Sequence, residues 1–292
     1  MQKTVLLTGA TGFLGSHLLK ELVARGCTVV ILKRSTSNTR RIQLQLADIV
    51  SYDVDTQPVG LAFSQHKIDA VIHTACHYGR NGDSLSRVVE GNLMFGLSVL
   101  EAADRFEVPV FINTDTLLPR ALNAYTLSKK QFVDWLQKQS ENVQVVNLRV
   151  EHMYGPGDDE TKFVPWILSQ LKSNAEEVRL TWGEQYRDFI YIDDVTSAFL
   201  TVMESAVALP KFSEFDVGTG RLVTIRNFLE CLMETYERDF GPVATRLAFG
   251  ALPYRQGEMM TVELDSTPLR ALGWTPGTWI EDGLARIMKE YR

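Results

Sequence analysis

A tyrosine and a lysine four positions apart are the first side chains in this sequence whose types and spacing point to chemistry. Tyr125 and Lys129 lie at the start of a helix-like stretch that runs to residue 139. On a helix, side chains four positions apart share one face. An ammonium beside a phenol lowers the pKa of the phenol, so the tyrosine can trade a proton with an alcohol or a carbonyl near neutral pH. The same spacing also occurs by chance on surface helices, so the neighbouring segments must decide.

Hydroxyl and acid side chains follow the apolar, strand-like run at residues 109–113, just upstream of this pair. They are Thr114, Asp115 and Thr116. In an open parallel sheet, ligands bind at the carboxyl ends of the strands. We therefore predict that Thr114 donates a hydrogen bond to a substrate oxygen beside the tyrosine. Asp115 and Thr116 are predicted to bind the substrate.

A glycine-rich turn follows the first strand-like run, residues 4–8, and opens the first helix-like stretch. Its glycines are Gly9, Gly12 and Gly15. Such a turn lets the backbone approach a pyrophosphate, and the N–H groups at the start of the helix then face the phosphates. A glycine turn alone is weak evidence, but its place between a strand and an amphipathic helix predicts a dinucleotide site. The predicted cofactor contacts in this turn also include Thr11, Phe13 and Leu14.

The end of the second strand-like run, residues 28–32, indicates which dinucleotide is bound. In an NAD site an acidic residue usually meets the adenosine ribose at this place. Here the chain continues with Lys33, Arg34 and Ser35, which can hold a 2′-phosphate instead. We therefore favour NADP over NAD, and the alternative is a solvated basic turn.

Asp53 and Val54 stand at the end of the third predicted strand. At this edge of the sheet they are predicted to meet the adenine of the cofactor. A turn or helix-cap role for Asp53 is the alternative.

Apolar, β-branched runs alternate with helix-like stretches through the first half of the chain. Continuous apolar strands separated by helices predict a parallel sheet covered on both faces. The predicted fold class is therefore α/β, with a doubly wound, Rossmann-type dinucleotide-binding domain over residues 1–160. Strands are expected at residues 4–8, 28–32, 70–74, 109–113 and 143–148, and helices at 15–25, 92–106 and 128–139.

The regular alternation ends after about residue 150. We expect a smaller, mostly helical substrate-binding lobe over residues 161–292, with segments near 187–220 returning to the first domain. Helices are expected there at residues 162–172, 195–204, 225–236 and 280–289, and strands at 189–192 and 214–217.

Composition argues against several classes of protein. The formal net charge of −6 disfavours nucleic acid and anionic membrane surfaces as partners. No apolar run approaches the roughly 20 residues that span a bilayer, and no secretory leader is expected. The three cysteines are widely spaced and contain no CxxC pair. Neither a metal site nor a disulfide framework is therefore expected, and a cytoplasmic location is favoured.

Together these motifs resemble the extended short-chain dehydrogenase/reductase family, specifically its NAD-dependent epimerase/dehydratase group, over nearly the whole chain. Tyr125 and Lys129 match the catalytic pair of that family, and Thr114 matches its hydroxyl partner. The glycine turn matches its cofactor turn. Further segments similar to hallmarks of the family are Ile72–Ala75, Asn92 with Gly96, Leu148–Arg149, Met153–Gly157, Arg187–Val195 and Asp216–Gly220.

The resemblance implies a mechanism and an assembly. Tyr125 acts as general acid/base, Lys129 tunes it and holds the nicotinamide ribose, and Thr114 orients an oxygen of a nucleotide-diphosphate sugar. Hydride passes between the nicotinamide and a sugar carbon. The resemblance also implies a homodimer formed by the helices at 92–106 and 125–139. The further cofactor contacts that it implies are Thr74, Ala75 and Asn92.

Substrate contacts are harder to assign. Arg187 and Arg255 are basic groups in family-like positions of the second lobe, and either can clamp the diphosphate. A surface arginine or a structural salt bridge is the alternative. His77 follows the fourth strand and either borders the sugar or belongs only to a loop.

The residue at position 116 bears on the reaction. Members that dehydrate a hexose carry Thr-Asp-Glu at this strand end, whereas this chain has Thr116 in the third place, and threonine is too weak a base to remove a sugar proton. Two reactions remain: reduction of a 4-keto-6-deoxy or dideoxy nucleotide sugar, and epimerisation with bound NAD. The segment looks like that of 4-ketoreductases of the CDP-abequose synthase type, which serve bacterial polysaccharide synthesis. A non-catalytic dinucleotide-binding sensor is less favoured, because such a protein needs no proton relay.

Overall fold

The chain forms two compact units. The computed structural model describes residues 2–80, 82–139, 143–255 and 257–291. The first unit comprises residues 1–150, 196–217 and 267–274, and the second comprises residues 151–195, 218–266 and 275–292. The first unit thus ends before the predicted boundary at residue 160. A second returning segment, 267–274, was not predicted.

A seven-stranded, wholly parallel sheet lies at the centre of the first unit, in the order β10-β6-β5-β4-β1-β2-β3. Its central apolar strands, such as β1 and β4, are buried on both faces, as expected for a sheet covered on both sides. The strand order reverses between β1 and β4, and ligands of such sheets bind at this switch point. The strands are β1 (Thr4–Thr8), β2 (Thr28–Lys33), β3 (Ile49–Asp53), β4 (Ala70–His73), β5 (Val110–Thr116), β6 (Gln144–Val150) and β10 (Phe212–Val217).

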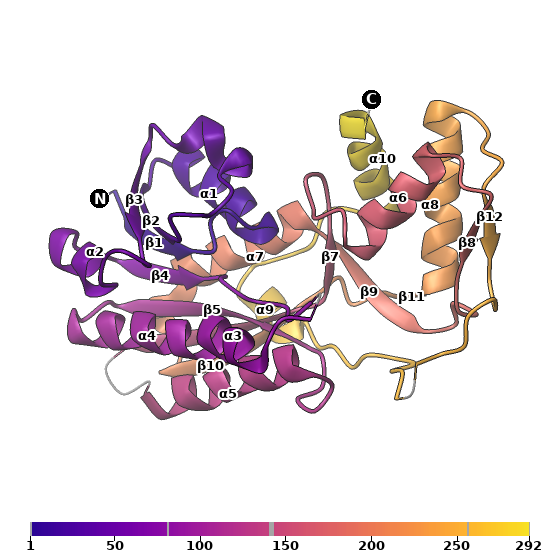
Figure 1. The fold of residues 1–292 in the computed structure, drawn as a ribbon. Coiled ribbons are helices and arrows are strands. Elements are labelled where there is room, and N and C mark those ends of the chain that lie inside the picture. Colours follow the sequence, from indigo (N-terminus) through magenta and orange to yellow (C-terminus); the bar gives the residue numbers. More distant parts are fainter. Residues whose placement is uncertain (1, 81, 140–142, 256, 292) are drawn as a thin grey trace. The chain divides into compact units, whose positions relative to one another are not determined.

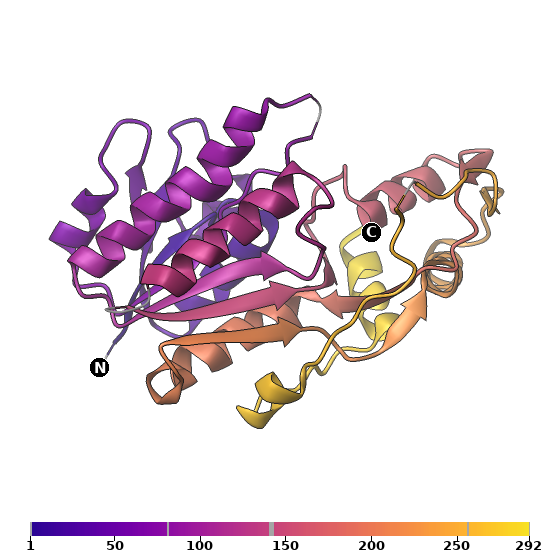
Figure 2. The same cartoon turned by 90° about the horizontal axis from the view of Figure 1, so that it is seen from below.

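Helices cover the two faces of this sheet. Figure 2 shows α4 and α5 side by side along one face, and the part of α7 that belongs to this unit lies on the other. The predicted doubly wound α/β fold is therefore confirmed (Figure 1). The helices are α1 (Phe13–Ala24), α2 (Gly60–Gln65), α3 (Leu85–Val89), α4 (Phe95–Arg105), α5 (Ala124–Gln139), α7 (Ile192–Ser205) and α9 (Thr267–Ala271), with a π-helical turn η2 (Glu90–Met94) between α3 and α4 and two 3-10 turns, η1 (Arg40–Gln45) and η3 (Ala206–Ala208).

Aromatic packing fixes the position of α5 over the sheet. Phe111 on β5 and Phe132 on α5 are fully buried, and their ring centroids lie 6.3 Å apart. A Cβ on Gly96 of α4 would lie 2.8 Å from the Phe132 ring, so the glycine allows α4 to pack closely against α5. This packing sets the place of the candidate catalytic residues on α5 relative to the end of β5.

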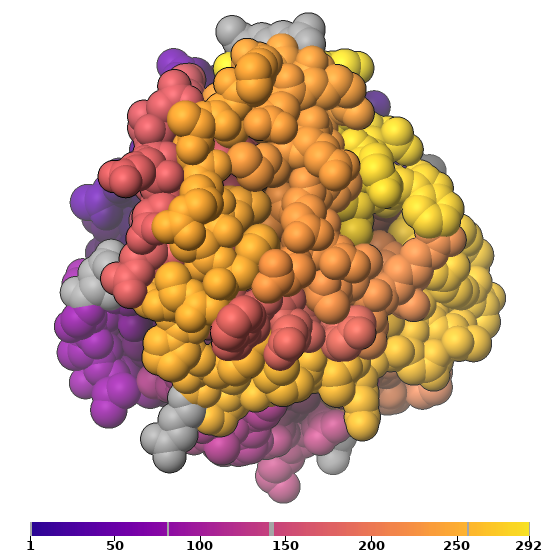
Figure 3. Space-filling model, turned by 90° about the vertical axis from the view of Figure 1, so that its right-hand side faces the viewer, coloured from indigo at the N-terminus to yellow at the C-terminus, as the bar shows by residue number. Residues whose placement is uncertain are grey.

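The described residues of the second unit form two small sheets and several helices, so this unit contains more strand than the predicted lobe. The Phe189 and Phe228 rings stack with centroids 3.7 Å apart and join β9 to α8. Figure 3 shows α8 and the segment that follows it, in orange, on one face of this unit. One sheet contains β7 (His152–Tyr154), β9 (Tyr186–Tyr191) and β11 (Leu222–Thr224), the other contains β8 (Glu177–Arg179) and β12 (Arg246–Ala248), and the helices are α6 (Phe163–Lys172), α8 (Ile225–Phe240) and α10 (Ile280–Tyr291).

Candidate active site

The glycine turn after β1 is closed in by the end of β4. Gly9 has a φ of +69°, and a Cβ on it would lie 2.6 Å from the Thr74 hydroxyl oxygen. A Cβ on Gly15 would lie 2.1 Å from the carbonyl oxygen of Gly9. Both positions therefore require glycine. Helix α1 begins at Phe13, and its first-turn N–H groups have no partner within the helix. The turn fits a dinucleotide pyrophosphate in both shape and donors.

The side chains of this turn divide between core and surface. Leu14 is buried in the core, so only its backbone N–H can face a phosphate. Phe13 packs edge to face against His17, with ring centroids 5.3 Å apart. Thr11 and Gly12 stay accessible to solvent.

Thr8 and His73 tie the ends of β1 and β4 together. His73 Nδ1 lies 2.9 Å from the Thr8 hydroxyl, which also accepts the N–H of Ala75 at 3.2 Å. The Thr74 hydroxyl donates to the Thr8 carbonyl at 2.8 Å. Burial, and to a smaller degree the charge of Lys129, lower the pKa of His73 to about 3. The His73 ring is therefore neutral and contacts the Thr8 hydroxyl, and Thr8 in turn holds Thr74 and Ala75, two predicted cofactor contacts, beside the glycine turn.

Acids at the end of β3 and just beyond it face the end of β2 and the turn that follows it. Lys33 forms a short ion pair with Asp53. Ser35 donates its N–H and its hydroxyl to Asp55, at 2.9 and 2.5 Å. Asp53, which was predicted to meet the adenine, therefore has a partner in Lys33. Asp55 was not predicted to have a role at this site. Arg34 is exposed.

The three candidate catalytic residues lie on two elements that pack together, α5 and β5. Strand β5 extends past its predicted end and includes Thr114. Among the described residues, the buried Thr114 hydroxyl has no hydrogen-bond partner, and a ligand oxygen would satisfy such a group. Lys129 is only 2% exposed. The ring of Tyr78 covers that of Tyr125, with centroids 4.9 Å apart.

The surroundings of Tyr125 favour its protonated form. Burial raises the pKa of the phenol well above its ordinary value, and Cys76 and Asp115 raise it further. Arg80 lowers this pKa, but its effect is smaller. Burial also lowers the pKa of Lys129. The predicted lowering of the tyrosine pKa by Lys129 is therefore wrong for this structure, because loss of solvation dominates and the cation that lowers this pKa is Arg80. The phenol carries its proton at neutral pH, as a general acid must before it can donate.

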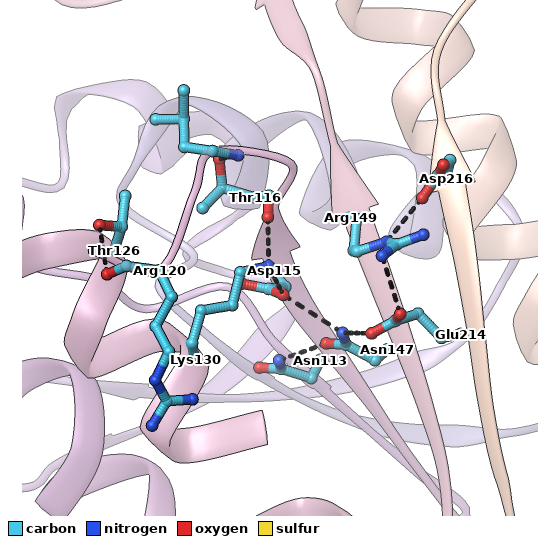
Figure 4. A network of polar contacts seen from close by, with 11 residues as sticks. Asn113, Asp115, Thr116, Arg120, Thr126, Lys130, Asn147, Arg149, Glu214 and Asp216 are labelled. Atoms are coloured by element: carbon cyan, nitrogen blue, oxygen red, sulfur yellow. Dashed lines mark hydrogen bonds and ion pairs between the residues drawn. The ribbon is translucent and has the colours of Figure 1, made fainter. Parts of the chain in front are cut away.

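A polar network surrounds the carboxyl end of β5 (Figure 4). The Asp115 carboxylate is buried and lies 2.6 Å from Lys130 Nζ, which also donates to the Thr116 carbonyl at 2.6 Å. The Asn147 amide contacts Asp115 at 3.3 Å and Glu214 at 2.7 Å. Asp115, through Oδ2, and Thr116, both predicted to bind substrate, are thus held by contacts within the protein, while Asp115 Oδ1 is buried with no hydrogen-bond partner among the described residues.

Asn92 joins the loop after β4 to α5. It accepts the N–H of His77 at 2.6 Å, donates to the His77 carbonyl at 2.8 Å, and donates to the Ser128 hydroxyl at 2.9 Å. Asn92 was predicted to touch the cofactor, and the structure gives its amide these contacts within the protein. The imidazole of His77 lies 3.0 Å from Asp83.

Comparison with known proteins identifies the family. Residues 5–218 match the sequence model of the NAD dependent epimerase/dehydratase family. This chain belongs to that family. A CDP-abequose synthase of Salmonella typhimurium is 31% identical over 301 aligned positions, covering 99% of this chain and 98% of that protein. Another, from Salmonella muenchen, is 29% identical with the same coverage. The structure of a UDP-glucose 4-epimerase from Thermotoga maritima matches with a TM-score of 0.84 at 25% identity, covering 99% of this chain and 98% of that one. The predicted resemblance is confirmed.

In this member of the NAD dependent epimerase/dehydratase family, the two candidate substrate arginines differ in their surroundings. Arg187 is buried, forms an ion pair with Glu258 at 3.0 Å, and donates to the Tyr186 carbonyl at 2.7 Å. The structural salt bridge named as its alternative is therefore present. Arg255 is exposed.

A carboxylate–imidazole pair in the second unit was not predicted. The buried Glu151 accepts the backbone N–H of His152 at 3.0 Å and lies 2.6 Å from its Nδ1. A carboxylate on Nδ1 orients an imidazole and leaves Nε2 for another partner. The adjacent residues Glu151 and His152, three positions after the predicted strand at 143–148, were the available signal, but the sequence does not show that the glutamate is buried.

Proposed function

We propose that this protein reduces the keto group of a 4-keto-6-deoxy or dideoxy nucleotide sugar, with NADPH as the preferred reductant. The main support for the proposal is the arrangement of acid and hydroxyl side chains around Tyr125. Its phenol keeps a proton, the Thr114 hydroxyl lacks a partner among the residues that the structure describes, and the Asp115 carboxylate is buried against Lys130. Thr116 stands where dehydrating members carry a glutamate. The site therefore has a proton donor, and the carboxylate on β5 is that of Asp115, which is paired with Lys130 through Oδ2; the absence of a second carboxylate at position 116 favours reduction over dehydration. The likeness to the CDP-abequose synthases supports the same reaction.

The side chains of the site have separate tasks in this mechanism. When bound, the reduced nicotinamide supplies a hydride to the carbonyl carbon. Tyr125 gives its proton to the carbonyl oxygen, which yields the alcohol and leaves a tyrosinate. The neighbouring Lys129 stabilises the tyrosinate, and the Thr114 hydroxyl donates a hydrogen bond that orients the carbonyl oxygen.

The cofactor would be held by the first unit. The N–H groups of the turn that contains Gly9, Gly12 and Gly15 would meet its pyrophosphate. The preference for NADP rests on Arg34, which lies in the turn where an NAD site usually has an acid. The family as a whole is described as NAD dependent, so NADP is a specific proposal for this chain.

Absorbance of the reduced nicotinamide tests the reaction directly. Purified protein is mixed with NADPH and a 4-keto-6-deoxy nucleotide sugar, and a stoichiometric fall in absorbance is expected. Tyr125→Phe should lose about 100-fold or more of the turnover, the range of a lost general acid, and should still bind the cofactor. Tyr78→Phe, which keeps the ring that covers Tyr125, is the matched control and should retain turnover.

Epimerisation with bound NAD is the second candidate, because the chain is similar over its full length to a UDP-glucose 4-epimerase structure. An epimerase would interconvert sugar isomers in the same mixture without consuming NADPH. A dinucleotide sensor would do neither, and Tyr125→Phe would leave it unchanged.

We also propose a homodimer that packs through η2, α4 and α5. Met94, Leu127 and Trp135 are apolar side chains on these elements and are exposed. Sedimentation at micromolar concentration should show a dimer, and a monomer would contradict the proposal.

A cytoplasmic location is proposed from the cysteines. Cys27, Cys76 and Cys231 are all free, which fits a reducing compartment. Within the described ranges, no helix combines the length and the apolar character needed to cross a membrane. Cell fractionation would test the location.

A further inference from the structure

Two contacts with the same sequence separation join the ends of β2 and β3. Lys33 is paired with Asp53, which is also its partner in the parallel strand register. Two positions further on, Ser35 donates its N–H and its hydroxyl to Asp55, at 2.9 and 2.5 Å. The N–H of Val54 donates to the Lys33 carbonyl at 2.8 Å. The register of the two strands therefore continues as side-chain pairing beyond their last residues.

These contacts leave Arg34 as the available cation of the turn. Its backbone N–H donates to the Ser37 hydroxyl at 3.1 Å, and no described residue accepts a hydrogen bond from its exposed guanidinium. The charges of Lys33 and Arg34 are balanced by those of Asp53 and Asp55. The net charge of these four side chains is therefore zero, although the two residues Lys33 and Arg34 alone form a basic segment of the sequence.

We propose that Asp55 is a specificity-determining residue that weakens binding of a 2′-phosphate, so that discrimination between NADP and NAD depends on Arg34 alone. The inference rests on the proposed use of a dinucleotide by this turn. A phosphate monoester carries a charge of about −1.5 to −2 and needs donors. Both donors of Ser35 already serve a carboxylate, which has the same sign of charge as the phosphate.

The state and exposure of Asp55 set the size of the effect. The hydrogen bonds from Ser35 lower the pKa of the Asp55 carboxyl below its ordinary value, so the group is charged at neutral pH. The carboxylate is exposed, and solvent and salt screen its repulsion of a phosphate. We therefore expect a change of about 1.5- to fivefold in affinity, a typical size for exposed charges, and a smaller change at high salt.

Calorimetric titration with two nucleotides isolates the 2′-phosphate. Adenosine 2′,5′-bisphosphate and 5′-AMP differ only in that group, and neither needs turnover. Asp55→Asn should tighten binding of the bisphosphate by about 1.5- to fivefold and leave 5′-AMP unchanged. Glu101→Gln removes one negative charge from the exposed surface of α4 and should change neither affinity.

Two further variants separate this model from direct phosphate binding by Ser35. Arg34→Ala should bring the affinities for the two nucleotides close together. Ser35→Ala should leave the preference for the bisphosphate in place or raise it, because the serine hydroxyl is already engaged by Asp55. If Ser35 holds the phosphate itself, Ser35→Ala will weaken the bisphosphate selectively.

Other results would overturn the inference. A weaker bisphosphate complex in Asp55→Asn would mean that the carboxylate prepares Ser35 for the phosphate. Equal changes for both nucleotides, or no change, would mean that Asp55 does not read the 2′-position. If the unaltered protein bound neither nucleotide, both this inference and the proposed cofactor would be rejected, whereas binding without the Asp55 effect would reject the inference alone.

Discussion

The Asp115 carboxylate lies 2.6 Å from the Lys130 ammonium. Each of these residues directly follows, in the sequence, a residue with a proposed role in the reaction. Asp115 follows Thr114 on β5, and Lys130 follows Lys129 on α5. The Asp115 side chain is 0% exposed and that of Lys130 is 19% exposed. A pair this deeply placed joins the strand end to the helix, and removal of one partner would leave the other charge poorly compensated.

Lys130→Met should lower the free energy of unfolding by about 3 kcal/mol, the lower end of the range for breaking a buried pair, because Lys130 keeps some contact with solvent. The double variant Asp115→Asn/Lys130→Met should recover part of that loss. Chemical denaturation of the single and double variants measures the coupling. Arg120→Met, which breaks the exposed Arg120–Asp134 pair, should have little effect. Equal losses of stability in Lys130→Met and Arg120→Met would show that the burial of Asp115 does not add to the cost of breaking its ion pair.

The pH dependence of turnover should report the raised pKa of Tyr125. Since the phenol acts as an acid, kcat/KM for reduction should hold through neutral pH and fall only at alkaline pH, as the tyrosine loses its proton. Arg80 is the nearby charge that lowers this pKa, so Arg80→Gln should move the alkaline limb to higher pH. A shift to lower pH, or an acid limb alone, would speak against Tyr125 as the donor.

His73 should make the fold sensitive to acid. Its pKa is about 3 in the folded protein against an ordinary value of 6.5, so only the unfolded chain binds a proton between these values. The free energy of unfolding should therefore fall as pH drops from 6.5 towards 3, by at most about 1.4 kcal/mol per pH unit from this group. His73→Asn should flatten that part of the stability profile. Thr8→Val, which removes the hydroxyl partner but keeps the imidazole, should cost about 1 kcal/mol without flattening it. An unchanged slope in His73→Asn would reject the assignment.

The glycine turn should tolerate a methyl group at one position better than at another. A Cβ on Gly15 would lie 2.1 Å from the Gly9 carbonyl oxygen, whereas a Cβ on Gly12 would lie 3.2 Å from it. Gly15→Ala should weaken dinucleotide binding by more than about tenfold and lower the melting temperature, while Gly12→Ala should have a smaller effect on both. Fluorescence titration and thermal unfolding measure the two quantities. The reverse order would show that the turn is placed differently.

Much of the first unit could be predicted from local patterns. The strand at Thr4–Thr8 was predicted with its observed bounds, because continuous apolar runs of this length are typical of buried parallel strands. Gly9 was a useful marker of the turn in the sequence, because its backbone has a positive φ and lies close to Thr74, so that no side chain fits there. The second unit was predicted less well: its five short strands carry too few residues for a clear period.

The sequence by itself determined the family, the parallel sheet and the glycine turn, and it singled out Thr114, Tyr125 and Lys129 as the candidate catalytic residues. Each of these features depends on residue types at short, regular spacing. Only the tertiary structure decided what surrounds them. It buried Asp115 against Lys130, engaged Ser35 with Asp55, and raised the pKa of Tyr125 instead of lowering it. These outcomes depend on strand register and on the removal of water by packing, and both arise from residues brought together across the sheet rather than along the chain.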